Sequence, residues 1–551
     1  MGFIVGINGR ASRRRAVIAA ALLSAVPLAA CSSGAGGSTA GTPAFRAEIT
    51  TEVAAATTPV ENLTWNLATG EPPTLDPAQS ALENISSVVG NMCEALFVYD
   101  RDYELRPALA EAVEHPDPLT YVFTLREGAT FWNGNPVTAE DVVFSITRIL
   151  DPVLASPWAA WAANLESVTA TSENTVTLTL TRPDPLVENF FALPAFAVVE
   201  RAFTEQAGAD FGKAGTGVMC TGPYEFSGWN QGQSIELTRN DDWWNEQAAP
   251  KVGSVTFTFT TDPAAQIAAL RSGETDGQWI IPTSAFDQLA ATGNLLFGES
   301  LQTVFISGTD LSGPMGDPAV RAALRAAVDY QGISEAVYRG IAAPLRALVP
   351  PSAYGYAEAT YQQAYTSLPE PTQNLDRVAE LVAQTPRAAE ELVLAYFAGS
   401  DEESRAATAI ADAANQAGMN VQLQPLTAAE FGAAFASPAA RQGFDALLSL
   451  GYLDFPEPLA YYQFFTTGNF YNFAGWSNPE YDQLIGQALA TVDDARRAEL
   501  VTQAQALILD EGIVIPIVSP ATSVYYGPEL TGLVPRQSYL YTPWLAELGG
   551  P

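Results

Sequence analysis

Short stretches with large apolar side chains at every second position recur along this chain, and they constrain its fold more than any other feature. Residues 121–125, 176–180 and 255–259 each alternate apolar residues with valine or threonine. A period of two with β-branched partners is typical of a strand that buries one face. These stretches therefore predict half-buried β-strands.

Helical patterns lie between the predicted strands. Thr138 and Asp141 have the spacing of a capping box. The apolar face of the helix that follows would hold Val142, Ile146, Ile149 and Leu150. Asp317 and Pro318 predict another helix start, because a proline at the first helical position loses no hydrogen bond. Two alanine-rich segments also predict helices, at 402–418 and 482–508. The mixture indicates an α/β fold without repeats of 20–50 residues.

The N-terminal segment is typical of a secretory signal. Residues 1–47 contain no acid, and arginines at 10 and 13–15 precede an apolar stretch at 16–30. That stretch is short for a membrane span, which needs about 20 apolar residues. It ends in Leu-Ala-Ala-Cys, which is similar to a bacterial lipobox, so Cys31 is predicted to carry a lipid. Export by the general or the twin-arginine route stays open.

The charge balance restricts the partners of the chain. Among 551 residues, 61 acids face 26 lysines and arginines, for a net charge of −35. Such a surface opposes binding to nucleic acid and to anionic membranes. The lipid on Cys31 would be the only membrane contact, and we expect an exported monomer on the outer face of the cell membrane.

Two further cysteines, Cys93 and Cys220, are the remaining thiols. Outside the cell such a pair is more often a disulfide than a metal or redox site. A disulfide is therefore the preferred interpretation, with two buried free thiols as the alternative.

The sequence offers little for catalysis. His115 is the single histidine and lies in the proline-rich segment Glu-His-Pro-Asp-Pro at 114–118, which favours a structural role in a turn over a catalytic one. No zinc spacing, phosphate-binding loop or nucleophile elbow is present in the sequence. We therefore expect no enzyme, metal or cofactor, although a pair of facing carboxylates in an extracytoplasmic hydrolase stays an alternative.

A series of motifs with glycine and proline turns runs from about residue 63 to residue 520. The most specific is the segment 131–142, Phe-Trp-Asn-Gly-Asn-Pro-Val-Thr-Ala-Glu-Asp-Val. Another motif lies before it, at 73–77. The others come after it, at 221–224, 239–244, 270–276, 317–324 and 475–482. Together they resemble the family 5 extracellular solute-binding proteins, which include oligopeptide-, dipeptide- and nickel-binding components of ABC importers.

The resemblance implies an α/β fold of the periplasmic-binding-protein type II class: a two-lobed clamshell with two crossovers and an extra subdomain in the first lobe. The ligand would be enclosed between the lobes. The expected boundaries are a signal peptide with lipobox (1–31), a flexible tether (32–60), lobe I (61–300, with the extra subdomain at 105–217), lobe II (301–514) and a C-terminal segment that returns to lobe I (515–551).

The resemblance also suggests which residues hold the ligand. In peptide-binding relatives an aspartate before an aromatic residue pairs with the peptide ammonium, and Asp454 occupies that place here. Gly451 and Tyr452 stand where those relatives have a tryptophan, and the backbone of Gly451 is a candidate partner for an extended peptide. The other candidates are Trp158, whose ring would line the cleft, Leu82 through its backbone, Phe305, and Arg441 as a receptor for a ligand carboxylate.

Two readings therefore compete with delivery of a peptide to the permease subunits of an ABC importer. The same fold could bind an oligosaccharide, a metal chelate or another small solute, and tryptophans without a carboxylate anchor would favour a sugar. A lipoprotein that senses a ligand without transporting it is the second.

Overall fold

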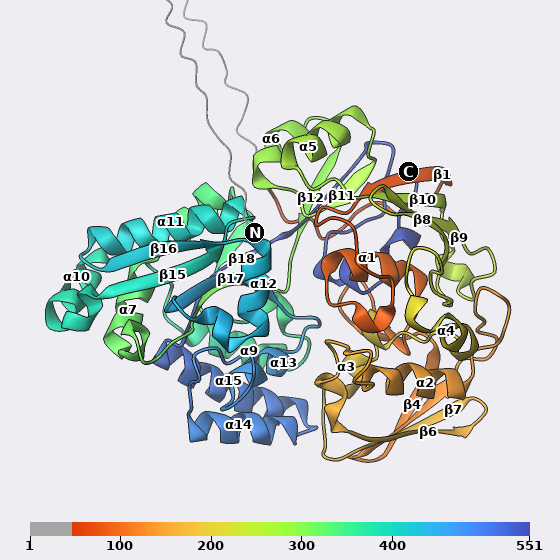
Figure 1. Ribbon diagram of the computed structural model, residues 1–551, viewed down its shortest axis with the longest axis horizontal. Helices are drawn as coiled ribbons and strands as arrows, with labels where there is room; N and C mark the ends of the chain where they lie inside the picture. The colour runs from red at the N-terminus through yellow and green to blue at the C-terminus, as the bar shows by residue number, and fades with distance from the viewer. Residues whose placement is uncertain (1–46) are drawn as a thin grey trace, which may run out of the picture. The chain divides into compact units, whose positions relative to one another are not determined.

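The computed structural model describes residues 47–551, in which the strands form four sheets (Figure 1). The predicted signal peptide, Cys31 and the first part of the predicted tether lie outside the described residues. Within residues 47–551 no helix is long and apolar enough to cross a membrane.

The first sheet combines the first strand of the described chain, five strands between residues 224 and 298, and one strand near the C-terminus. Its strands are β1 (Val60–Asn66), β8 (Tyr224–Asn230), β9 (Ser234–Arg239), β10 (Val252–Thr258), β11 (Gly277–Trp279), β12 (Asn294–Gly298) and β19 (Thr522–Tyr526). They are ordered β12-β19-β11-β1-β10-β9-β8, with β1 parallel to both β10 and β11. Trp65 of β1 is fully buried against Trp544, with ring centroids 4.7 Å apart. The C-terminal segment therefore completes the core of this sheet.

The second sheet is built from the later half of the chain. Its strands are β13 (Gln302–Gly308), β14 (Ala342–Pro344), β15 (Glu391–Phe397), β16 (Asn420–Leu426), β17 (Ala446–Tyr452) and β18 (Val514–Pro520). They are ordered β14-β18-β13-β17-β15-β16, with β15 parallel to β16 and β17. Three helices accompany this sheet in Figure 1, α7 (Pro318–Ala327), α10 (Leu375–Gln384) and α11 (Asp401–Gln416). The predicted helix start is confirmed, since Asp317 accepts a hydrogen bond from the backbone of Ala319 at 2.9 Å.

A third, antiparallel sheet is formed by β4 (Ala110–Asp117), β5 (Thr120–Leu125), β6 (Leu165–Ser172) and β7 (Thr175–Leu180), ordered β4-β5-β7-β6. The strands predicted at 121–125 and 176–180 are confirmed here. Helix α2 (Ala139–Ile149) covers the sheet and begins at the capping box of Thr138 and Asp141 that the sequence predicts. Leu150 was wrongly placed on its buried face, because it lies at the helix end with 41% of its surface exposed.

The remaining elements connect these sheets. A two-stranded ribbon joins β2 (Phe97–Tyr99) to β3 (Leu105–Pro107). The other helices include α1 (Glu83–Met92), α3 (Val187–Phe190), α4 (Arg201–Ala207), α5 (Pro263–Ser272), α6 (Phe286–Leu289), α8 (Tyr330–Gly332), α9 (Glu358–Ser367), α12 (Ala428–Ala436), α13 (Pro458–Tyr462), α14 (Pro479–Leu489) and α15 (Asp494–Glu511). The helix predicted at 482–508 is thus two helices, because Asp493 caps a new start by accepting from Arg496 N at 2.8 Å.

The predicted tether extends too far into the folded chain. Thr50 N donates to the carbonyl of Phe297 at 2.6 Å, and Thr57 N donates to that of Gly550 at 2.9 Å. Segments distant in sequence supply these partners, so the composition of residues 47–60 alone does not reveal them. The chain is bound to the folded body from about Ile49, and β1 begins at Val60.

The chain passes between the first and second sheets twice, from β12 to β13 and from β18 to β19. The predicted return to the first lobe at residue 515 is too early, because β18 pairs with β13 in the second sheet. The first strand of the return is β19, which pairs with β11 and β12. The two passages touch, since the hydroxyl of Ser300 donates to the carbonyl of Pro520.

Cys93 and Cys220 are joined by a disulfide. Cys93 caps the end of α1, and Cys220 stands directly before the turn at 221–223. The bond therefore fixes this turn against α1.

Candidate functional site

An aromatic cavity of about 340 Å³ lies at the ends of β13 and β17. The later half of the chain supplies most of its wall: Phe305, Ser307, Phe435, Leu450, Gly451, Tyr452, Asp454, Tyr461, Phe464, Phe465, Tyr471 and Phe473. The first half supplies Ala81, Pro157, Trp158 and Trp161. Its volume is at the lower end of the range of about 300–1,000 Å³ that is usual for small-molecule sites.

Asp454 is the charged residue of this wall. It follows β17 by two residues, and the phenol of Tyr541 donates a hydrogen bond to its Oδ1 atom. Burial raises the pKa of Asp454 to about 6, and the hydrogen bond from Tyr541 opposes that rise. The carboxylate is therefore ionised at neutral pH in surroundings that stabilise its charge poorly.

Gly451 allows the aromatic wall to close around β17. A β-carbon at this position would lie 2.2 Å from the hydroxyl oxygen of Tyr461 and 3.0 Å from the ring of Phe305. The rings of Phe305 and Tyr461 meet edge to face at 6.3 Å. A glycine is required here because of this close approach.

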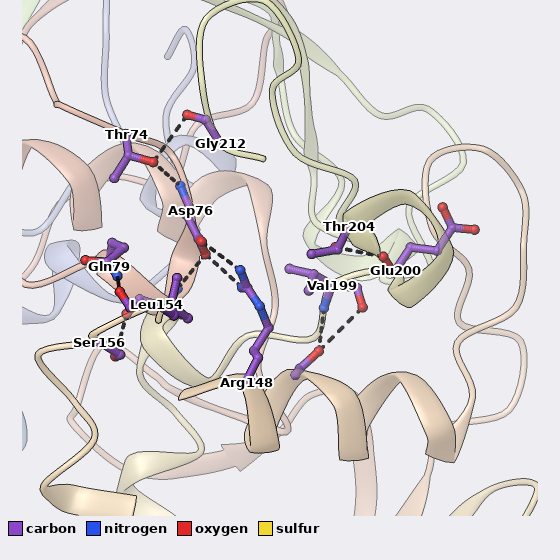
Figure 2. Close-up of polar contacts among 12 residues, drawn as sticks. Thr74, Asp76, Gln79, Arg148, Leu154, Ser156, Val199, Glu200, Thr204 and Gly212 are labelled. Carbon is purple, nitrogen blue, oxygen red and sulfur yellow. Dashed lines mark hydrogen bonds and ion pairs between the residues drawn. The ribbon is translucent and has the colours of Figure 1, made fainter. Parts of the chain in front are cut away.

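Hydrogen bonds of Ser156 and Gln79, which Figure 2 shows, hold the loop that leads to Trp158. The hydroxyl of Ser156 donates to the carbonyl of Ala78 at 2.6 Å and accepts from Trp158 N at 3.2 Å. Gln79 donates to the carbonyl of Leu154 at 2.7 Å. The loop that carries Trp158 is thereby fastened to residues 78–79.

Residues 78–79 are themselves anchored by a buried ion pair. Asp76 accepts from Ala78 N at 3.0 Å and from both terminal nitrogens of Arg148, at 2.8 and 2.7 Å (Figure 2). A bidentate pair of this kind defines orientation as well as distance. It ties α2, which carries Arg148, to the segment that supports the cavity loop.

A larger hollow of about 680 Å³ lies elsewhere, beside α7, α10 and α15. It contains three arginines that are already partnered. Arg325 donates to Leu509 O at 2.9 Å, Arg346 to Leu368 O at 3.0 Å, and Arg377 to Glu380 at 3.1 Å. These cations are engaged within the chain, and we assign no ligand to the hollow.

Residues 104–473 match the family of bacterial extracellular solute-binding proteins, family 5. The chain belongs to this family. Family 5 proteins with assigned ligands are similar along most of the chain. The dipeptide-binding protein DppE of Bacillus subtilis is 27% identical over 471 residues, covering 81% of this chain and 84% of DppE. The glutathione-binding protein GsiB of Escherichia coli K12 is 27% identical over 476 residues, covering 83% and 89%.

Solved structures share the family 5 fold. The ABC transporter substrate-binding protein CtaP of Listeria monocytogenes superposes with a TM-score of 0.77 at 22% identity, covering 89% of this chain and 99% of CtaP. OppA of Haemophilus influenzae, in complex with the peptide RPPGFSPFR, gives 0.72 at 22% identity, covering 89% and 99%. The expected α/β fold of a two-lobed periplasmic binding protein is confirmed. These relatives are binding proteins by name.

The structure brings five of the seven ligand candidates together on the aromatic cavity: Trp158, Phe305, Gly451, Tyr452 and Asp454. Leu82 does not line it. Its side chain is 53% exposed, and its carbonyl accepts from Ser86 N at 2.9 Å as part of the start of α1. The preceding residue, Ala81, lines the cavity instead.

Arg441 stands behind the wall. Its guanidinium stacks on Phe473 at 4.2 Å from the ring centroid, and Nη1 donates to the carbonyl of Ala434 at 2.6 Å. The role of carboxylate receptor predicted for Arg441 therefore has no support from its position.

Sequence reasoning missed most of the aromatic wall. The missed rings are Trp161, Phe435, Tyr461, Phe464, Phe465, Tyr471 and Phe473. The density of aromatic residues between 461 and 473 was a signal that could have indicated them.

His115 lies away from the cavity, on β4, where it contacts Glu188 at 3.0 Å. Its predicted place in a turn was wrong, because the prolines beside it fall at the irregular end of a strand. No cluster of three or more metal-binding side chains occurs among the described residues.

Proposed function

We propose that this protein is an exported lipoprotein that captures a peptide or peptide-like solute and delivers it to the permease subunits of an ABC importer. The observation that carries this proposal is Asp454 on an otherwise uncharged, aromatic cavity. The dipeptide, glutathione and oligopeptide ligands named for its relatives agree with it.

Asp454 is suited to hold a ligand ammonium. Tyr541 occupies Oδ1, and within the described chain Oδ2 receives no hydrogen bond. An ammonium that donates to Oδ2 would form a charge-assisted bond, which is strong once water is excluded. It would also neutralise a carboxylate that burial destabilises.

The lobes are proposed to follow the sheets. Lobe I would contain the first sheet, with residues 105–217 as its extra subdomain, and lobe II would contain the second sheet. The cavity wall then takes Trp158 and Trp161 from the subdomain and the rest chiefly from lobe II. A ligand that contacts both groups of residues would favour the closed arrangement by its additional contacts.

Lipid anchoring through Cys31, a monomeric state and the absence of catalysis are parts of the same proposal. The net charge of −35 supports a body that stays away from nucleic acid and anionic lipid surfaces. A hydrolase would need two facing carboxylates, and among the residues that line the cavity Asp454 stands alone.

The test is binding by the purified mature protein. We expect dipeptides or longer peptides to raise its melting temperature, and mass spectrometry to find peptides that co-purify with it. Asp454→Asn should weaken peptide binding at least about thirtyfold, because the ligand ammonium loses its counter-charge. Asp412→Asn, which changes an exposed acid on α11, is the matched control.

A different ligand class would give a different pattern. Trp158 and Trp161 both line the cavity and could stack on a sugar ring. Binding of oligosaccharides with unchanged affinity in Asp454→Asn, and no response to peptides, would replace the peptide proposal by the sugar alternative.

A further inference from the structure

The cavity wall has one charge. Of the described residues that line it, Asp454 alone is ionised at neutral pH, and the others are apolar, aromatic or hydroxyl-bearing. Burial raises the pKa of Tyr452 and of Tyr461, so both phenols stay neutral. A ligand in this cavity therefore meets a negative charge and no positive one.

The cation Arg441 contacts the wall from behind and does not itself line the cavity. Phe473 lies between them, since its ring lines the cavity and is covered by the Arg441 guanidinium at 4.2 Å. Nη1 of Arg441 is engaged with the carbonyl of Ala434. A ligand carboxylate inside the cavity would thus lack an ionic partner, and burying an unpaired charge among aromatic rings is strongly unfavourable.

We propose that the cavity selects a ligand with one ammonium for Asp454 and an apolar body for the aromatic wall, with no carboxylate enclosed. This inference rests on the proposed function and narrows its ligand class. Two sources share this chemistry. One is a small amine or amide without an acid group, and the other is the N-terminal part of a longer peptide whose carboxylate lies outside the cavity.

One further observation agrees with this charge pattern. The net charge of −35 attracts cations and repels anions at a distance. Association with such a ligand should therefore slow as the salt concentration rises.

The test compares matched ligands by calorimetry on the purified mature protein. Alanyl-phenylalanine amide carries an ammonium and a neutral end, the free acid adds a carboxylate, and the N-acetylated amide lacks the ammonium. We expect the amide to bind at least about tenfold more tightly than either analogue. Equal or tighter binding of the free acid would overturn the inference.

Two more ligands distinguish the sources. Phenethylamine should bind measurably if a small amine is enough. A tetrapeptide acid that binds as tightly as its amide, while the dipeptide amide binds and the dipeptide acid binds poorly, would place the carboxylate of the longer peptide outside the cavity. Either result supports the inference. If the longer peptides bind but phenethylamine and both dipeptide forms do not, the inference fails and the proposed function stands, whereas no binding of any peptide removes both.

Two variants assign the preference to its residues. Asp454→Asn should abolish the advantage of the amide over the N-acetylated amide. Arg441→Gln should leave the ratio of amide to acid affinity unchanged, and a selective loss of acid binding would show that Arg441 receives the carboxylate after all.

Discussion

The phenol of Tyr541, near the C-terminus, donates a hydrogen bond to Oδ1 of Asp454 at the end of β17. These residues are 87 positions apart and belong to segments on either side of the second passage between the sheets. The bond lowers the pKa of Asp454, which burial raises, so the C-terminal segment influences the charge of the one acid among the described residues of the cavity wall.

The first prediction concerns pH. Burial raises the pKa of Asp454 from an ordinary 3.8 to about 6. Below about pH 6 the carboxylate becomes protonated, so the affinity for a cationic peptide should fall about tenfold per pH unit. Calorimetric titrations between pH 4.5 and 8 measure this, and an affinity independent of pH would contradict it.

The free energy of unfolding of the ligand-free protein should depend on pH in the opposite direction, and should fall as the pH rises. The folded chain holds a proton on Asp454 that the unfolded chain releases above about pH 3.8. The stabilising contribution of this group is therefore complete below pH 3.8 and is lost as the pH rises through about 6. Asp454→Asn should remove both pH dependences, whereas Asp412→Asn should keep them.

The second prediction is for Tyr541→Phe. The hydrogen bond from Tyr541 lowers the pKa of Asp454, so its removal should raise that pKa further. We expect the midpoint of the affinity profile to move to higher pH, with binding several-fold weaker at pH 7 and nearly restored at pH 9. Tyr526→Phe, whose hydroxyl faces Leu533 O at 3.4 Å, is the matched control and should leave the midpoint in place.

The third prediction is for Gly451→Ala. The added methyl group would lie 2.2 Å from the hydroxyl of Tyr461 and must displace that ring. Overpacking of this kind costs about 1–3 kcal/mol, and we expect a similar loss in the free energy of unfolding together with weaker binding. The double change Gly451→Ala with Tyr461→Phe removes the clashing hydroxyl and should recover part of the loss. Urea unfolding of the four proteins measures the coupling, and additive effects would contradict this account.

The fourth prediction concerns the disulfide. The bond between Cys93 and Cys220 closes a long loop, with a sequence separation of 127. Replacing both cysteines by alanine should lower the free energy of unfolding by about 2–4 kcal/mol. Dithiothreitol should bring the natural protein to the same stability and leave the double variant unchanged. If dithiothreitol also lowered the free energy of unfolding of the double variant, its effect would not come from reduction of this disulfide, and the prediction would be contradicted.

Local features of the fold were predictable because a few neighbouring residues decide them. The capping box of Thr138 and Asp141 and the proline after Asp317 start helices where the sequence places them. The return to the first sheet was placed too early, at residue 515, since residues 514–526 form two consecutive strands whose sheets depend on distant partners. Likewise, residues 49–58 are held by Phe297 and Gly550, which no local pattern reveals.

The candidate site was predictable only where a motif marked it. Asp454 follows from its position before Phe455, and it lies on the cavity. The ring of Tyr461 faces the same cavity because it packs over a glycine on β17, and the positioning of Trp158 depends on a contact with Ala78. The prediction of Leu82 was wrong by one residue, since Ala81 lines the cavity and the carbonyl of Leu82 accepts a hydrogen bond at the start of α1.

One residue, Ala521, separates β18 in the second sheet from β19 in the first. Its backbone N–H donates to the carbonyl of Ile341 at 2.9 Å, so even this residue is partly fixed. The other passage, between Gly298 and Gln302, leaves three residues free of either sheet. With so few backbone dihedral angles available, the two sheets can pivot about an axis through the passages but cannot slide far apart. We therefore expect ligand entry to occur by rotation about that axis, with the longest path for the residues farthest from it.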